Sequence, residues 1–138
     1  MKNSKDRKEL TLQLQPAENK DIIIGKANDL DIQIKEFEPA MNMYETDDQI
    51  ILIMEMLGVR PEDISIEGNY NFLEVKSGPV NLDIPPFAKV KNEEFSLFAF
   101  RRMIDLDSIQ ADPETIRVDL KHGLLKIEMA KRKQPVYN

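Results

Sequence analysis

Apolar and polar residues alternate along much of the chain in short stretches, which turn residues separate about every ten positions. The clearest example is TIRVDLKHGLLKIEMAK, in which two alternating halves meet at Gly123. Successive side chains of a β-strand point to opposite faces, so this repeat of two is typical of strands that are buried on one face. The spacing of about 3.6 residues expected of an amphipathic helix is scarce. The pattern therefore predicts an all-β domain, either a sandwich or a barrel.

Seven segments carry this strand pattern. The expected strands cover residues 41–45, 49–57, 64–67, 71–76 and 95–106, followed by the two strands of a closing hairpin. The stretch GPVNLDIPPFAKVKNEE, residues 78–94, is expected to hold no central strand, because its three prolines cannot donate a hydrogen bond to a sheet. DSIQADPE is expected to connect the long strand to the closing hairpin.

The closing hairpin is expected to have one buried face and one solvent-exposed face. Gly123 supplies the conformational freedom of the turn, and His122, which precedes it, is interpreted as an ordinary turn residue. Leu125 then begins the buried face of the last strand. The residues expected on the buried face are Ile116, Val118, Leu120, Leu125, Ile127 and Met129.

The strand at residues 49–57, QIILIMEML, is apolar in both phases of the alternation. Its core phase holds Leu52, Met54 and Met56, and its opposite phase holds Ile51, Ile53 and Leu57. A half-exposed strand would alternate cleanly between apolar and polar residues. We therefore expect the segment before Pro39, or another subunit, to pack on the outer face of this strand.

Composition narrows the classes of function. A length of 138 residues fits one domain, and 25 acidic against 19 basic residues give a net charge of -6 that disfavours binding to nucleic acid. The absence of cysteine excludes disulfides and thiolate metal sites and fits a reducing compartment. The chain opens on a charged stretch, and its longest apolar run is far shorter than the roughly 20 residues of a membrane span. A cytoplasmic protein without membrane contact is expected.

No motif predicts catalysis or a bound cofactor. The five glycines do not form a phosphate-binding loop of the type Gly-x-x-x-x-Gly-Lys-Ser/Thr. His122, a lone histidine, cannot build a metal site without carboxylates at suitable spacing, nor a triad without a placed nucleophile. The acidic pairs at 47–48 and 93–94 and the basic run at 131–133 are interpreted as solvated charges. No catalytic residue, cofactor or metal is assigned.

Four motifs follow one another along the chain: the turn and strand GVRPEDISIE, the strand NFLEV, the strand FAFRRMIDL and the hairpin IRVDLKHGLLKIEM. In order and register they resemble the α-crystallin domain of the small heat-shock proteins, the HSP20 family. The resemblance implies an immunoglobulin-like antiparallel β-sandwich. It divides the chain into a partly flexible N-terminal arm at residues 1–38, the domain at residues 39–131 and a short tail at residues 132–138.

The same resemblance implies a chaperone that acts without ATP, holds partly unfolded client proteins and keeps them from aggregating. It implies no enzyme activity. Such a protein can accept an extended segment along an open sheet edge. In the family the binding groove lies between the strands that correspond to ISIE and IRVDLK. Alternating aliphatic residues are equally typical of an ordinary core, and only the family position favours the groove. The groove residues carried over are Ile64, Ile66, Ile116, Val118 and Leu120.

Self-association, as a dimer or a small homo-oligomer, is also implied by the resemblance. Arg102 stands at the arginine of the family's Phe-x-Arg strand, where it contributes to a dimer interface and is expected to need a carboxylate partner. Residues 78–94 correspond to the segment that bacterial and plant members exchange between subunits. Within it FAKVK, with Phe87 and Val90, is the expected pairing piece. Pairing along the strand at residues 95–106 is the alternative.

The family's C-terminal Ile-x-Ile tail, which fills a neighbour's groove, is not found after the closing hairpin. Two Ile-x-Ile spacings occur in the N-terminal arm instead, Ile22 with Ile24 in DIIIG and Ile32 with Ile34 in DIQIK. In an extended chain both isoleucines point to one face, which fits an apolar groove. Either segment is a candidate plug. The alternative is an ordinary extra strand that covers the strand at residues 49–57.

Two other classes of function fit the same fold. A co-chaperone or scaffold of the p23-like kind would bind one specific folded partner. A structural component would co-assemble with one native partner. Suppression of the aggregation of an unrelated heated client by the protein alone distinguishes a holdase from both.

Overall fold

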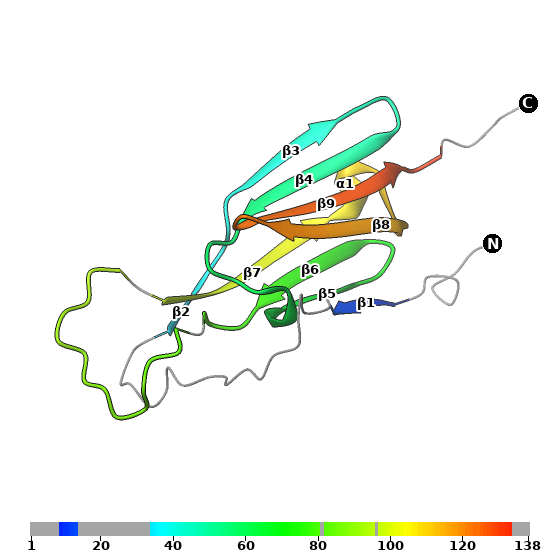
Figure 1. The fold of residues 1–138 in the computed structure, drawn as a ribbon. Coiled ribbons are helices and arrows are strands. Elements are labelled where there is room, and N and C mark those ends of the chain that lie inside the picture. The colour runs from blue at the N-terminus through cyan, green and yellow to red at the C-terminus, as the bar shows by residue number, and fades with distance from the viewer. Residues whose placement is uncertain (1–8, 14–33, 81, 96, 134–138) are drawn as a thin grey trace, which may run out of the picture.

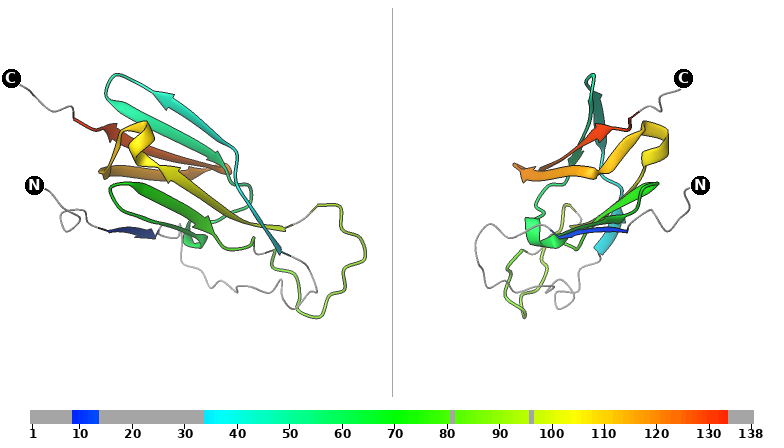
Figure 2. Two further views of the ribbon diagram at one scale, coloured as in Figure 1. Left: turned by 180° about the vertical axis from the view of Figure 1, so that it is seen from behind. Right: turned by 90° about the vertical axis from the view of Figure 1, so that its right-hand side faces the viewer.

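Two β-sheets pack face to face, because the alternating strands each present one apolar face that must be buried (Figures 1 and 2). The structure is a computed structural model and describes residues 9–13, 34–80, 82–95 and 97–133. The predicted all-β fold is confirmed, and of the two architectures that the alternation left open it is the sandwich.

The first sheet has five strands in the order β1-β5-β6-β7-β2. They are β1 (Leu10–Gln13), β5 (Ile64–Gly68), β6 (Phe72–Ser77), β7 (Leu97–Asp105) and β2 (Ile34–Phe37). Neighbouring strands are antiparallel, except that β2 runs parallel to β7. Both edge strands of this sheet come from the N-terminal segment, for which the sequence alone predicted no definite strand.

The second sheet has four strands in the order β3-β4-β9-β8, all antiparallel. They are β3 (Met41–Glu45), β4 (Gln49–Glu55), β9 (Leu124–Lys131) and β8 (Ala111–Lys121). The predicted strands of the main body are therefore all present. β4 ends at Glu55, two residues before the predicted limit, because a turn at Leu57–Gly58 interrupts it.

The core lies between the sheets and follows the predicted phases. In β4 the side chains of Leu52 and Met54 are fully buried, as is Met56 just after it. The opposite phase is less covered: Ile51 and Ile53 are half-buried, and Leu57 is 77% exposed. The N-terminal strand β2 does not cover β4, since it pairs with β7 of the other sheet. The buried apolar residues of the two sheets form one cluster.

The connection after β7 differs from the predicted loop. A short helix, α1 (Leu106–Ile109), follows directly, because the Asp105 side chain accepts hydrogen bonds from the backbone N–H groups of Asp107 and Ser108. β8 then begins at Ala111, inside DSIQADPE, and its register shifts between Asp112 and Arg117. The shift disturbs the alternation of apolar and polar residues, and for this reason the sequence pattern did not predict the first part of β8 as a strand.

The turn between β8 and β9 confirms the role of Gly123. Its φ is 79°, and His122 before it has a φ of 56°, so both residues of the two-residue turn are left-handed, as in a type I′ hairpin. A Cβ atom placed on Gly123 would meet no atom closer than 3.7 Å. The glycine is therefore required by the backbone angle and not by a lack of space.

Between β6 and β7 the chain leaves the sandwich and returns, forming the arm at residues 78–96 (Figures 1 and 2). No strand occurs among its described residues, 78–80 and 82–95, as the prolines predicted.

Candidate binding groove and subunit interface

The five proposed groove residues lie on β5 and β8, one strand from each sheet. Ile64 and Ile66 are fully buried, and Ile116, Val118 and Leu120 are partly buried against the same core cluster. The side chains of β8 are thus more accessible than those of β5. β8 ends its sheet order, so no described strand pairs with its outer edge.

The edge of β5 is covered by β1. The two strands are antiparallel, with Leu12 opposite Ile66 and Leu10 opposite Gly68. Leu10 and Leu12 are half-buried and pack against the core cluster. These leucines were missed by sequence reasoning, although the alternation in LTLQLQ carried the signal.

Of the four candidate plug residues, Ile22, Ile24 and Ile32 lie outside the described residues. Ile34 begins β2 and lies opposite Leu97 of β7, at the other edge of the sheet from β1. The structure therefore does not bring Ile34 to the edge of β5. The two-residue spacing that occupies this edge is Leu10–Thr11–Leu12.

Arg102 points inward from β7, in phase with the buried Phe100 and Ile104. Its expected carboxylate partner is not among the described residues. Instead, Nη1 donates a hydrogen bond of 2.8 Å to the backbone carbonyl of Pro39, and Nε is buried without a described partner. The neighbouring Arg101, which the sequence offered as the alternative to Arg102, points outward and pairs with Glu74, so the two arginines lie on opposite faces of the sheet.

The two other predicted interface residues lie on the arm, and both are solvent-accessible. Phe87 is 94% exposed and Val90 is 47% exposed. Pro85 accepts a hydrogen bond from the N–H of Ala88, so a turn precedes Val90. The structure does not bring these residues to Arg102.

The basic run at residues 131–133 is not simply solvated, which corrects the sequence interpretation. Arg132 lies over the ring of Tyr70, 4.1 Å from its centroid, and its Nη1 pairs with Asp107 at 2.8 Å. Its Nε donates to the carbonyl of Ala111 at 2.9 Å. Arg132 thus joins the end of β9 to α1, the start of β8 and the turn before β6.

Among the described carboxylates, Asp63 has a perturbed pKa. Burial at the turn before β5 raises it by desolvation; Glu62 also raises it, and Arg60 opposes the increase. The described residues contain no group of three or more His, Asp or Glu that could hold a metal ion. They also include no helix long and apolar enough to cross a membrane.

Residues 42–138 match the model of the Hsp20/alpha crystallin family. No curated protein matches the chain significantly.

Solved structures of small heat-shock proteins have the same fold. One from Xylella fastidiosa superposes with a TM-score of 0.57 at 23% identity, over 74% of this chain and 93% of that one. HSP18.5 from E. histolytica has a TM-score of 0.59 at 19% identity, over 74% and 95% of the two chains. Heat shock protein 16.0 from Schizosaccharomyces pombe has a TM-score of 0.56 at 20% identity, over 75% and 77%.

Proposed function

The chain belongs to the Hsp20/alpha crystallin family, and on this basis we propose that it is an ATP-independent holdase that binds partly unfolded proteins and suppresses their aggregation. Holding a client in this way uses sheet edges and apolar surface and requires no catalytic residue, nucleotide or metal. We place the protein in the cytoplasm, in agreement with its lack of cysteine.

The observation that carries the proposal is the pairing of β1 with β5. β1 has only four residues, and its two leucines are half-buried, so its contribution to stability is small. An extended client segment with two apolar residues at the same spacing could replace β1 on β5. Its side chains would then lie against the core cluster, as Leu10 and Leu12 do, and its backbone would take over the hydrogen bonds of β1.

Self-association is proposed at the free edge of β3. β3 ends its sheet order, and no described strand pairs with its outer side. The backbone N–H of Thr46 donates to the carbonyl of Gln49, and the N–H of Glu55 donates to the carbonyl of Ala40. Because bonded residues alternate along an antiparallel pair, the even-numbered residues of β3 also bond to β4. The N–H groups of the odd-numbered residues therefore point to the open edge. Met43 and Tyr44 are each 50% exposed there, and a segment from a second copy can pair with this edge.

The test of the holdase function is light scattering of an unrelated client protein heated in the absence of ATP. The purified chain is expected to reduce scattering in proportion to its concentration and to remain in soluble complexes with the client. An equal mass of a stable protein without chaperone activity serves as the control. Unchanged scattering would reject the holdase proposal and favour a p23-like or structural partner protein.

A further inference from the structure

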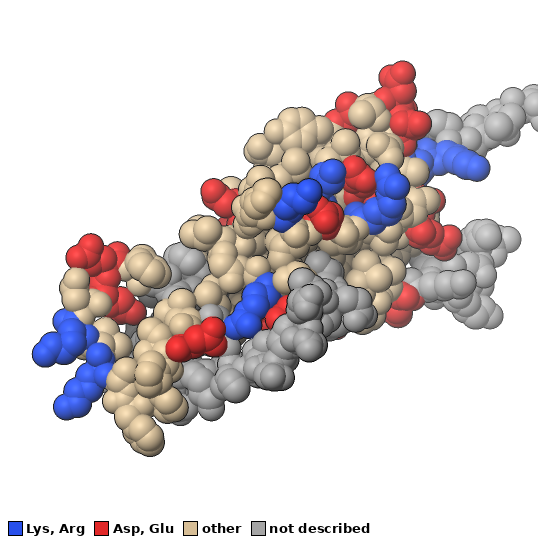
Figure 3. Space-filling view, viewed as in Figure 1, with Lys and Arg blue, Asp and Glu red and all other residues tan. Residues whose placement is uncertain are grey.

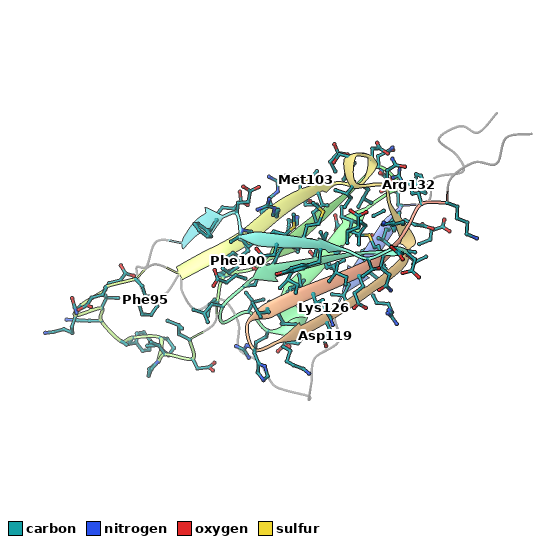
Figure 4. The ribbon with its side chains drawn as sticks, turned by 90° about the horizontal axis from the view of Figure 1, so that it is seen from above. Phe95, Phe100, Met103, Asp119, Lys126 and Arg132 are labelled. Carbon is teal, nitrogen blue, oxygen red and sulfur yellow. The ribbon has the colours of Figure 1, made fainter. Side chains whose placement is uncertain are left out.

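An apolar pocket of about 610 Å³ opens at the end of the sandwich from which the arm rises. Its volume lies in the range of about 300 to 1,000 Å³ typical of ligand pockets. Figure 4 shows Phe95 on the arm and Phe100 on β7 toward this end, and Arg132 toward the other. The apolar side chains that line the pocket come from both sheets, the arm and the turns, and include Phe37, Leu57, Val80, Phe95, Phe100 and Leu124.

Contacts between these elements hold the walls of the pocket in place. The backbone N–H of Met56 donates a hydrogen bond of 2.7 Å to the carbonyl of Gly123, which joins the turn after β4 to the tip of the closing hairpin. A Cβ atom placed on Gly58 would lie 3.4 Å from the side chain of Val80, so the same turn also packs against the start of the arm. The pocket is therefore preformed, which lowers the entropy cost of binding a ligand.

Aromatic rings and a carboxylate meet in this pocket. Phe37 and Phe100 contact each other edge to face, with ring centroids 6.1 Å apart, and Phe95 is 73% exposed at the rim. The described residues of the wall include one carboxylate, Glu55 at the end of β4, and no lysine or arginine. The imidazole of His122, also in the wall, can accept an N–H in its neutral form. Ring faces and carboxylates both attract cations, so the wall favours a positive group over an anion.

The surroundings leave the carboxylate of Glu55 accessible to a ligand. Glu55 is exposed, and no described residue forms an ion pair with it. Lys121 stands in the same row, two strands away, with Leu124 between them. Figure 3 shows largely uncharged surface where the arm joins the sandwich. A carboxylate beside apolar surface, in a chain with a net charge of -6, attracts a small apolar cation.

We propose that the apolar pocket binds a small organic amine, a molecule with an apolar body and one ammonium group. The body covers the apolar wall, which gains free energy by leaving water. The ammonium group donates hydrogen bonds to the carboxylate of Glu55 and is attracted by the phenylalanine rings. This site is separate from the β5 edge and the β3 edge proposed above for clients and for self-association.

A matched set of probes tests the chemical class of the ligand. Naphthylmethylamine, naphthylmethanol and naphthoate share one apolar body and differ in charge at neutral pH. Their fluorescence is followed as the full chain is added, since the chain contains no tryptophan. The amine is expected to bind once per chain and about tenfold more tightly than the carboxylate, with the alcohol between them. Equal affinities of the amine and the carboxylate, or no saturable binding of the amine, would overturn the proposal.

Variants of the wall locate the site. Glu55→Lys should reverse the preference, so that the carboxylate binds more tightly than the amine. Leu124→Ser should weaken all three probes about fivefold, because it removes apolar wall and no charge. The matched control is Met103→Ser, which should leave the affinities unchanged. Met103 is 47% exposed and Leu124 is 46% exposed, but Met103 lies farther along β7 and outside the pocket (Figure 4).

If Leu124→Ser and Met103→Ser bind the probes equally well, the probes bind elsewhere and the proposal is wrong. A Glu55→Lys variant that still prefers the amine would contradict it as well. Circular dichroism checks that each variant is folded. Should Leu124→Ser lower the Tm, Leu57→Ser replaces it, because Leu57 lines the pocket and is 77% exposed. Suppression of client aggregation is measured without the amine and tests the holdase function separately.

Discussion

Leu125 is fully buried because it follows the left-handed turn at His122 and Gly123 and the alternation of β9 then points it into the core. At this scale the stability of the hairpin depends on two separate features. One is the backbone angle of Gly123, and the other is the packing of Leu125 between the sheets.

Replacement of Leu125 by alanine is expected to lower the free energy of unfolding by roughly 2 to 5 kcal/mol, because it leaves a cavity in the packed core. Thermal and urea unfolding measure the change. Lys126→Ala, on the exposed face of the same strand, is the control and should shift stability by less than about 0.5 kcal/mol. A Leu125→Ala melt that overlays that of the parent would contradict the placement of this residue in the core.

Asp63 makes stability depend on pH. Desolvation raises its pKa in the folded state, so its favourable contribution is present below the pKa of the unfolded chain, about 3.9, and is lost as pH rises through the raised value. Asp63→Asn removes this dependence. The Tm of the variant relative to the parent is therefore expected to be highest near pH 7 and to decrease as pH falls toward 4. If the difference in Tm between Asp63→Asn and the parent stays constant from pH 7 to pH 4, Asp63 does not make stability depend on pH.

At the scale of single elements, the strands of the N-terminal segment complete the first sheet at both edges. β1 covers β5, and β2 covers β7. These short strands have few residues in contact with the core, so they are the elements most easily exchanged for another chain. Arg132 has the opposite effect at the end of β9, because its contacts to Asp107 and Tyr70 hold α1 and the start of β6 in place.

Detachment of β1 is expected to expose the proposed client groove. The double change Leu10→Ser and Leu12→Ser should lower stability by about 1 kcal/mol per leucine and should reduce the chaperone concentration needed for half-suppression of client aggregation. Thr11→Ala, at the exposed position between them, is the control. If stability falls while suppression stays the same, β1 is an ordinary structural strand.

At the scale of the whole molecule, the outer edges of β3 and β8 have no described strand paired with them, and one arm projects from the sandwich. β3 and β8 are the two ends of the second sheet, and the arm leaves after β6 (Figure 1). Edges of this kind are usually protected in monomers. The self-association proposed at the edge of β3 would protect that edge.

The change Met43→Pro should block pairing at the edge of β3 without removing a bond to β4, because the N–H of Met43 points away from β4. Light scattering should show a smaller particle mass for the variant than for the parent. At a concentration low enough for the parent to be monomeric, the Tm values of the two proteins should differ little. Met43→Ala keeps the N–H and is expected to keep the mass. Equal masses for the two variants would show that subunits associate elsewhere.

The amino-acid sequence by itself determined the strands of the main body, their buried faces, the turn at Gly123 and the strand-free arm. These features depend on side-chain alternation, proline and glycine, which act between near neighbours in the chain. The phase of Arg102 was predictable for the same reason.

Only the tertiary structure decided where the short N-terminal strands pair, which group Arg102 bonds to and how Arg132 is held. Each of these contacts joins residues far apart in sequence: Arg102 bonds to Pro39, and Arg132 to Tyr70. An apolar pocket lined by Leu57, Val80, Phe95 and Leu124 likewise exists only because the turn after β4, the two ends of the arm and the tip of the closing hairpin meet at one end of the sandwich. Local alternation cannot specify such a meeting, since it fixes the face of each strand but not which distant segment lies beside it.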